Sequence, residues 1–468
     1  MTTRAPSVGA APGDAGPTAP VGYAAVRIPL PTGVPLDPFA LAGGSGVVVA
    51  DGHRILVGLG RARTLELPGG LADGAGVDAV TSALAGIACD DRLGGDRAGP
   101  GHAVVAFGAL PFERSSPAAL VVPELIYGRE PDGTEWVTVV AAAGSALPDP
   151  DDPRTAEGLR SRLARRAADA TDASVPRAGG PVAPVVVPLT GDDEFERAVG
   201  AAVDAVHRRD VVKVVLARAV DVRLDDDVDV PDLLRRWSGL EPSCTVFSVP
   251  TPDGQFVGAS PELLVEREHD RFRSRPLAGT TDRTPDAASG LPAALLESAK
   301  DAEEHRLVVD AVRAALEPVA AVLHVPDRPE LVHLHTITHL GTSIDGTLRP
   351  GPDGSLPSAL HLVARLHPTP AVGGVPRAAA TELIHRLEAL PRGSYAGPVG
   401  WVDGAGDGRW MVGIRALTVD GRSVRMSAGV GIVSGSDPRT ELAETGLKFR
   451  AVFGALAPGA AFDTAPSD

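Results

Sequence analysis

The sequence has little cysteine, no long apolar run and fewer basic than acidic residues, and each shortage excludes a class of protein. Its two cysteines, Cys89 and Cys244, are far apart and lack CxxC spacing, which excludes a disulfide framework and a cysteine-based zinc site. No stretch of about eighteen apolar residues occurs, as a transmembrane helix would need. The N-terminal segment has no basic cluster followed by an apolar run. We therefore expect a cytoplasmic protein.

The charge balance limits the kinds of partner. Asp and Glu number 60 against 44 Lys and Arg, a formal net charge of −16. This excess of negative charge argues against nucleic acid and against anionic membrane surfaces as partners. An anionic small substrate would need cations gathered at its binding site. A hydrophobic fraction of 44% over 468 residues is enough for two or three average domains or one large α/β domain.

Composition divides the chain into four parts. Residues 1–20 are rich in Pro, Gly, Ala and Thr, which predicts a disordered tail, and 458–468 is expected to be a second tail. In residues 21–190, apolar runs alternate with Gly and Pro turns, which indicates the N-terminal part of a sheet-rich fold with a linker near 145–190. In residues 191–457, helical and strand patterns are interleaved.

Apolar periodicity predicts the main elements of residues 191–457. Helices are predicted at 192–209, at 298–319 and from Pro438 onward. Strands are predicted at 211–220, 331–340, 395–402, 410–419 and 423–432. We expect the last three strands to form an antiparallel meander that ends at the final helix.

The final helix carries a polar stripe beside an apolar one. Glu441, Glu444 and Lys448 are three and seven residues apart, which puts them on one side of a helix. Carboxylates that border a core-facing surface can hold a cation. The alternative is a solvated helix face with an ordinary Glu–Lys pair.

Lys213 lies within the apolar strand VVKVVLA, where Val215 and Ala217 share its face. The ammonium would then be pressed against apolar surface, and desolvation would lower its pKa. A lysine whose pKa approaches neutrality can take a proton from water as a general base. The alternative is an edge-strand lysine that guards against aggregation.

Glu262 follows Pro261 at the point where a turn meets a strand. Its carboxyl could project into a cleft at the end of a sheet and serve as a general acid. The alternative is a polar turn residue in solvent, which is common for a glutamate after proline.

Glu304 and Asp301 lie on the face of the predicted 298–319 helix that also carries apolar residues. Together with Glu441 and Glu444, Glu304 would supply the oxygen ligands that Mg²⁺ prefers. The alternative is a surface pair with Lys300 or a nearby arginine.

Two further patterns are weaker. His333, His335 and His339 lack the companion ligands of a zinc site, and His339 is the best candidate for a residue on the substrate side. Glycines 429, 431 and 435 do not match GxGxxG and precede an acidic helix, so nucleotide binding is not expected.

Nine motifs in fixed order resemble the chorismate-utilising enzyme family. They are KVVLAR, GASPELLVER, PLAGT, KDAEEHRLVV, HLGTSIDG, LHPTPAVGG, GSYAGPVGW, GIRAL and AGVGIVSGSDPRTELAETGLK. The match covers residues 192–456, and the N-terminal third is similar only loosely. The resemblance implies an α/β (α+β) fold, a large single domain with two stacked, mostly antiparallel sheets flanked by helices. It also implies that residues 191–457 form the chorismate-binding catalytic region.

The resemblance implies roles for the candidate residues. Mg²⁺ would be held by Glu304 and Glu444, with Glu441 and Asp301 acting through bound water, and would grip the ring carboxylate of chorismate. Six other positions match residues that contact the substrate: Tyr395, Arg415 and Lys448 at its carboxylates, and Gly279, Thr280 and His339 in the pocket lining.

Within the family, a lysine at position 213 marks the members that add water. The resemblance therefore implies an isochorismate synthase, an isomerase in which Lys213 deprotonates water that attacks ring carbon 2 and Glu262 protonates the departing 4-hydroxyl. Burial should lower the pKa of the lysine and raise that of the glutamate. Ala278 in PLAGT replaces the nucleophilic lysine of aminodeoxychorismate synthases, so a covalent route is not expected.

Three alternatives stay open from the sequence. They are a salicylate synthase, which also eliminates pyruvate, an amide-nitrogen synthase with a partner amidotransferase, and a catalytically silent chorismate-binding homologue. The expected partner is chorismate, with no nucleic acid, membrane or obligate protein partner. The residues do not distinguish menaquinone from siderophore biosynthesis as the destination of the product.

Overall fold

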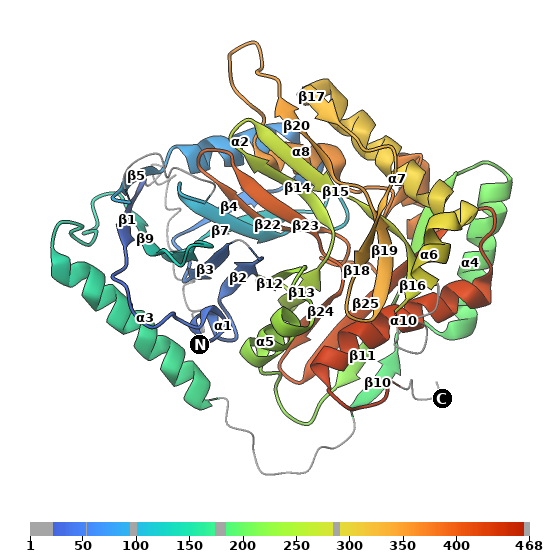
Figure 1. Ribbon diagram of the computed structural model, residues 1–468, viewed down its shortest axis with the longest axis horizontal. Coiled ribbons are helices and arrows are strands. Elements are labelled where there is room, and N and C mark those ends of the chain that lie inside the picture. The colour runs from blue at the N-terminus through green and yellow to red at the C-terminus, as the bar shows by residue number, and fades with distance from the viewer. Residues whose placement is uncertain (1–21, 53, 94–100, 174–183, 284–290, 463–468) are drawn as a thin grey trace, which may run out of the picture.

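The computed structural model describes residues 22–52, 54–93, 101–173, 184–283 and 291–462, which form three β-sheets surrounded by helices (Figure 1). Among the described strand pairings, only that of β1 with β5 is parallel. The predicted class is confirmed: a mixed α/β fold built on two large, mostly antiparallel sheets.

The largest sheet has thirteen strands and draws on both ends of the chain. In spatial order they are β10 (Val185–Pro188), β11 (Lys213–Arg223), β25 (Ser423–Ile432), β24 (Ala416–Asp420), β13 (Gly254–Ser260), β12 (Thr245–Thr251), β2 (Val47–Ala50), β3 (Ile55–Leu59), β8 (Leu125–Arg129), β9 (Glu135–Ala142), β1 (Tyr23–Pro29) and β5 (Ala88–Asp91), with β21 (Gly374–Val375) beside β11.

The second large sheet has nine strands, and a third, small sheet has three. The nine are β17 (Ala320–His324), β20 (Ile344–Leu348), β15 (Arg271–Arg275), β14 (Leu263–Glu268), β23 (Gly408–Val412), β22 (Pro398–Asp403), β6 (Val105–Ala109), β7 (Ala118–Val122) and β4 (Arg63–Leu67). The three are β16 (Leu277–Asp282), β19 (Ile337–Gly341) and β18 (Glu330–His333).

Helices cover these sheets on their outer faces and ends (Figure 1). They are α1 (Pro38–Ala42), α2 (Gly74–Ala85), α3 (Pro153–Ala173), α4 (Asp192–His207), α5 (Val230–Leu240), α6 (Leu291–Glu297), α7 (Ala299–Leu316), α8 (Ala359–Leu366), α9 (Arg377–Leu387) and α10 (Pro438–Leu456), with short 3₁₀ turns η1 (Gly70–Ala72) and η3 (Glu317–Val319).

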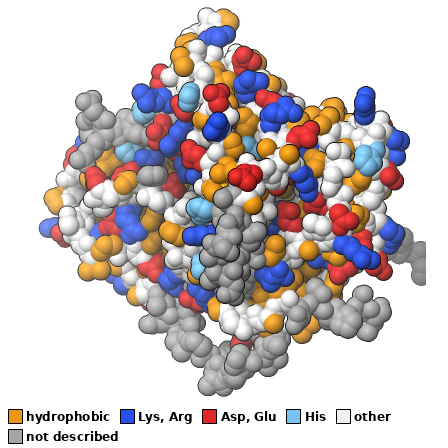
Figure 2. All heavy atoms as spheres, turned by 45° about the vertical axis from the view of Figure 1, so that its right-hand side comes forward, with side chains coloured by type: hydrophobic (Ala, Val, Ile, Leu, Met, Phe, Trp, Pro, Cys, Tyr) orange, Lys and Arg blue, Asp and Glu red, His pale blue; other side chains and the backbone are white. Residues whose placement is uncertain are grey.

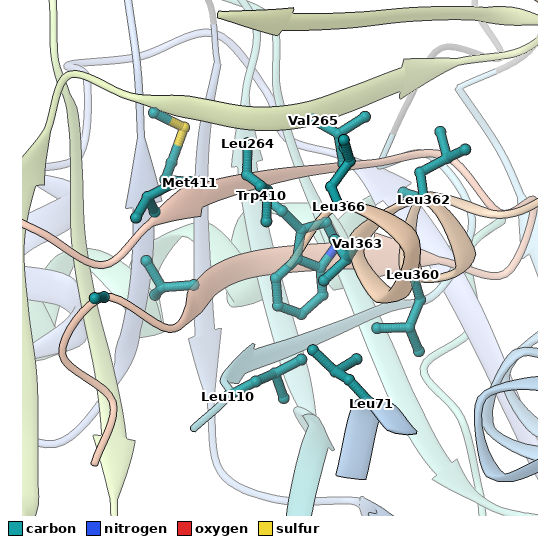
Figure 3. Close-up of a cluster of buried hydrophobic side chains, with 14 of the residues drawn as sticks. Leu71, Leu110, Leu264, Val265, Leu360, Leu362, Val363, Leu366, Trp410 and Met411 are labelled. Carbon is teal, nitrogen blue, oxygen red and sulfur yellow. The ribbon is translucent and has the colours of Figure 1, made fainter. Parts of the chain in front are cut away.

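The main hydrophobic core joins side chains of both large sheets. Phe256 of the thirteen-stranded sheet and Trp401 and Trp410 of the nine-stranded sheet belong to one buried cluster. Trp410 is fully buried and lies among leucines of α8, with Leu110 and Leu264 near it (Figure 3). Large aromatic and branched side chains of this kind dominate core energetics, so this packing fixes the two sheets relative to each other.

Two strand predictions need correction. The apolar run 331–340 is a hairpin of β18 and β19, because the chain turns where the Leu334 N–H donates to the Ile337 carbonyl. The run 410–419 is two strands in different sheets, β23 and β24, so the expected meander does not exist as one unit. In both places the apolar pattern continues through the turn and conceals it.

The thirteen-stranded sheet runs across the seam predicted near 145–190. β12, from the C-terminal part of the chain, pairs with β2 from the N-terminal part. The helix α3 occupies much of the predicted linker. The predicted N-terminal tail lies outside the described residues. Of the predicted C-terminal tail, 458–462 is described, and the Phe462 ring stacks on Phe449.

Charged side chains of both signs are interspersed over the face shown in Figure 2. No helix among the described residues is both long and apolar enough to cross a membrane. The absence of nucleic-acid and protein partners and the cytoplasmic location stay predictions.

Candidate active site

Two crossings of the chain between the large sheets form one side of a cavity. One crossing leads from β13 to β14 and carries Glu262, and the other leads from β23 to β24 and carries Arg415. The crossings are hydrogen-bonded to each other: Ser260 Oγ donates to the Val412 carbonyl (2.6 Å), and the Val412 N–H donates to the Glu262 carbonyl (3.0 Å). Both Glu262 and Arg415 line the cavity.

The final helix, α10, forms the opposite side. Asp437 caps it by accepting a hydrogen bond from the Thr440 N–H (3.0 Å), and Pro438 occupies the first turn, as predicted. Phe449 and Phe453 are buried, and α10 packs against β25. The side chain of Glu441 is only 1% exposed, so the alternative of a solvated helix face is wrong at this position.

Three carboxylates around the cavity each pair with a lysine. The distances are 2.9 Å from Lys213 Nζ to Glu304 Oε1, 2.9 Å from Lys300 Nζ to Glu441 Oε1, and 2.7 Å from Lys448 Nζ to Glu444 Oε1. The first pair joins β11 to α7, the second joins α7 to α10, and both members of the third lie on α10. A buried charge needs such a partner, because loss of one member leaves the other desolvated and unpaired.

Lys213 is the most buried of these lysines, with no exposed side-chain area. β11 is flanked by β25 on one side and by β10 and β21 on the other, so the alternative of an exposed edge-strand lysine is wrong. The ammonium makes no hydrogen bond of good geometry among the described residues, although Glu304 lies at ion-pair distance. Glu304 therefore pairs across to β11 rather than along its own helix.

Glu262 is 2% exposed. Burial raises its pKa to about 8, although a hydrogen bond from the Leu277 backbone and the charge of Lys213 oppose that rise. Its Oε1 has no hydrogen-bond partner among the described residues. At neutral pH Glu262 is therefore a neutral acid that carries a proton it can donate.

His339 is held as a neutral ring. Burial, reinforced by the charge of Arg415, lowers its pKa to about 3. Its Nδ1–H donates to the Gly279 carbonyl (2.8 Å), which leaves Nε2 to accept a hydrogen bond from Arg415 Nη2 (3.0 Å). Arg415 has a φ of +52°, an unusual conformation for a residue with a side chain, and its Nε makes no hydrogen bond among the described residues.

Two glycines of β25 make room for this cluster. A Cβ at Gly431 would lie 2.2 Å from Glu304 Oε1 and 3.0 Å from Lys213 Cε. A Cβ at Gly429 would lie 3.2 Å from the Tyr395 hydroxyl. That hydroxyl is itself buried, which raises the pKa of Tyr395 to about 12. A side chain at position 431 would thus push the Glu304 carboxylate out of its present position beside Lys213.

The cavity bounded by these groups is small, about 60 Å³. Pockets for small molecules usually measure roughly 300–1,000 Å³. Side chains that could bind an anionic ligand instead contact protein partners. Lys448 also donates to the Gly429 carbonyl (2.7 Å), and Arg415 bonds to His339. A ligand the size of chorismate must therefore displace some of these contacts.

Residues 51–457 match the family model described as "Chorismate binding enzyme". The chain is 40% identical over 381 residues to "Putative isochorismate synthase MenF" of Mycobacterium tuberculosis, an alignment that covers 79% of this chain and 90% of the relative. The chain belongs to the chorismate-binding enzyme family.

One further relative of this chorismate-binding enzyme resembles it in sequence, and one solved structure resembles it in fold. The isochorismate synthase DhbC of Bacillus subtilis is 38% identical over 280 residues, which is 58% of this chain and 69% of the relative. The structure of MenF, the menaquinone-specific isochorismate synthase of Escherichia coli, superposes with a TM-score of 0.71 at 23% identity, covering 93% of this chain and 95% of that one. The latter likeness shows the fold.

In this chorismate-binding enzyme, most of the predicted site residues lie at one cavity. Those that line it are Glu262, Gly279, Thr280, Glu304, His339, Tyr395, Arg415, Glu444 and Lys448. Lys213 and Glu441 lie behind this lining. Lys213 forms an ion pair with Glu304, and Glu441 lies close to the charge of Glu444. His333 is set apart, since its Nδ1 lies 3.1 Å from Thr338 Oγ1 and its ring is not part of the lining.

The predicted metal ligands have suitable chemistry but are not gathered around one point. Among the described residues, no group of three or more His, Cys, Asp or Glu side chains is placed to hold a metal ion. The physical reason is that each of the three carboxylates is turned toward its own lysine. The donor set suits Mg²⁺, but the positions of the carboxylates do not yet form a coordination shell.

Sequence reasoning missed two groups of this site. The sequence offers Lys300 only as a surface partner for Glu304, yet it pairs with the buried Glu441. Glycines 429 and 431 were considered only as a nucleotide motif. The available signal was their alternation along the strand, since glycine at every second position leaves one face of a strand without side chains. In the structure Gly429 and Gly431 lie opposite Ala217 and Val215 of β11.

Proposed function

We propose that the protein is an isochorismate synthase that converts chorismate to isochorismate and requires Mg²⁺. The observation that carries this proposal is a fully buried lysine, Lys213, directly behind a cavity lined by a buried glutamic acid, Glu262, whose pKa is raised to about 8. A base and an acid with separate roles are what the addition of water and the loss of a hydroxyl require. The relatives named as isochorismate synthases support the same reaction.

The reaction is an isomerisation, so its atoms balance without a co-reactant. Lys213, as a free amine, accepts a proton from water, and the oxygen forms a bond to ring carbon 2. The ring double bonds shift, the bond from carbon 4 to its hydroxyl breaks, and Glu262 gives that oxygen its proton so that water leaves. For Lys213 to act as the base, its pair with Glu304 must first open and its ammonium must give up a proton.

The remaining charged and polar groups would orient the substrate. Arg415 and Lys448, with Tyr395, are proposed to bind the carboxylates of chorismate, because a guanidinium can bond both oxygens of a carboxylate. Glu304 and Glu444, with Glu441, are proposed to hold Mg²⁺, which when bound would neutralise the ring carboxylate. Neutral His339 would offer no charge of its own and would keep Arg415 in position.

Product analysis tests the proposal. The purified protein is incubated with chorismate and Mg²⁺, and the products are separated chromatographically. We expect isochorismate. Salicylate with pyruvate would indicate a salicylate synthase, and anthranilate formed with ammonia or glutamine would indicate an amide-nitrogen synthase. Either result, or no turnover, would refute the proposal.

A further inference from the structure

All the lysines of this chain lie in one cluster. The sequence contains three lysines among its 44 basic residues, namely Lys213, Lys300 and Lys448. Each is paired with one of three carboxylates at the site, Glu304, Glu441 and Glu444 respectively. The cluster is therefore balanced in charge as it stands, with one ammonium for each carboxylate.

A divalent cation that joined this balanced cluster would create an excess of positive charge in a buried place. Such an excess is costly where the effective dielectric constant is low. The cost falls if one ammonium leaves as the cation arrives. The three lysines differ in their ability to leave, and this difference can be read from their surroundings.

Two of the ammonium groups are confined. Lys213 has no exposed side-chain area and lies on β11, where it pairs with Val375 of β21. Lys448 is 11% exposed and donates a second hydrogen bond to the Gly429 carbonyl (2.7 Å). Moving either group into solvent would require the surrounding strands or α10 to move.

Lys300 differs from both. It lies in the first turn of α7, its side chain is 37% exposed, and among the described residues its ammonium hydrogen-bonds to Glu441 alone. A long lysine stem at the end of a helix can turn outward and keep its charge in water. The carboxylate it holds cannot follow, because the Glu441 side chain is 1% exposed.

We propose that Lys300 is the exchangeable counter-ion of the site: it holds Glu441 until a divalent cation binds, and the cation displaces its ammonium into solvent. This inference rests on the proposed Mg²⁺ requirement and assigns Lys300 a positioning role. The exchange frees Glu441 to turn toward the cation. It explains why the three carboxylates are suitable ligands for Mg²⁺ but are not arranged around a common metal position among the described residues.

The exchange has a measurable consequence for cation affinity. Because the cation must compete with Lys300, removal of the ammonium should tighten cation binding. A hydrogen bond between charged groups in a partly buried place corresponds to roughly tenfold in an equilibrium constant. The same removal leaves the buried Glu441 without a cationic partner, so the variant should be less stable until a cation takes that place.

The test uses the full chain and Mn²⁺, whose electron paramagnetic resonance signal reports the free ion, with Mg²⁺ as competitor and no chorismate. Lys300→Met should bind Mn²⁺ about tenfold more tightly than the wild type, and Lys300→Arg should bind it much as the wild type does. Arg306→Met is the matched control. Arg306 lies on the same helix and is 63% exposed, and its removal changes the net charge equally. It should not change the affinity.

Thermal unfolding supplies a second readout. Lys300→Met should melt below the wild type without divalent cation, and saturating Mn²⁺ should remove most of the difference. Equal or weaker Mn²⁺ binding by Lys300→Met, including no measurable binding by either protein, would overturn the inference. So would an equal gain in Arg306→Met. Because chorismate is absent, these results are independent of which product the enzyme forms.

Discussion

Lys213 and Glu304 meet at 2.9 Å beneath the cavity, although Lys213 comes from β11, next to the edge strand β10, and Glu304 from a helix about ninety residues later in the chain. Neither element alone would require an ionisable group on its buried face. The meeting of the two places an amine out of contact with solvent and next to the cavity that Glu262 lines.

Replacement of Lys213 by methionine should abolish most turnover. Methionine keeps the length and apolar character of the stem but has no basic nitrogen. A general base contributes roughly 10²–10⁴-fold to the rate, so kcat should fall by about that factor. Chorismate binding, measured by calorimetry, should persist because Arg415 and Lys448 are unchanged. Turnover at the wild-type rate would show that another group activates water.

The pH dependence of kcat/KM should report the acid. The pKa of Glu262 is raised to about 8, so its proton is present at neutral pH and is lost as the pH rises through that value. We expect kcat/KM to decline above about pH 8. In Glu262→Gln, residual activity should be lower by roughly 10²–10⁴-fold and should lack this decline. A decline that persists unchanged in Glu262→Gln would assign it to another group.

The same shift predicts a pH-dependent difference in stability. Between the ordinary value of 4.5 and the folded-state value of about 8, folded protein binds one more proton at Glu262 than unfolded protein does. This contribution therefore weakens stability as the pH rises over that window. Glutamine does not titrate, so the free energy of unfolding of Glu262→Gln relative to wild type should rise from pH 5 to 8 and then level off. Urea denaturation at several pH values measures it, and a difference that is constant with pH would contradict the assignment.

Gly431→Ala should damage the site far more than Gly435→Ala. The new Cβ at position 431 would lie 2.2 Å from Glu304 Oε1, whereas nothing lies within 4 Å of a Cβ at position 435. We expect Gly431→Ala to lose most activity as the Lys213–Glu304 pair is forced apart, with at most a small change in melting temperature in Gly435→Ala. Similar activities of the two variants would mean that the pair is not required in its observed position.

The sequence predicts the elements of the site better than their contacts. The helix that begins at Pro438 follows from local pattern, and the apolar neighbours of Lys213 within its own strand are the signal for its burial. The raised pKa of Glu262 depends on burial by several elements, and in the sequence it is indicated only through the family resemblance. The pairing of Lys300 with Glu441 does not follow from local pattern, because it depends on the distance between two helices far apart in sequence.

The local sequence pattern also does not show which sheet each strand joins. The residues from 410 to 419 are apolar enough for one strand, yet the chain leaves one sheet and enters another around Arg415. The positive φ of Arg415 is part of that crossing. No periodicity marks such a change, because both strands carry mostly buried apolar side chains. The crossing is nevertheless what places Arg415 at the cavity.

The measurement that tests the central claim most directly is the origin of the hydroxyl on ring carbon 2. Chorismate is incubated with the enzyme and Mg²⁺ in water enriched in ¹⁸O, and the isolated product is analysed by mass spectrometry. The account predicts isochorismate with one ¹⁸O at carbon 2, formed by the wild type and not by Lys213→Met. Isochorismate without the label, or labelled product formed equally well by Lys213→Met, would contradict it.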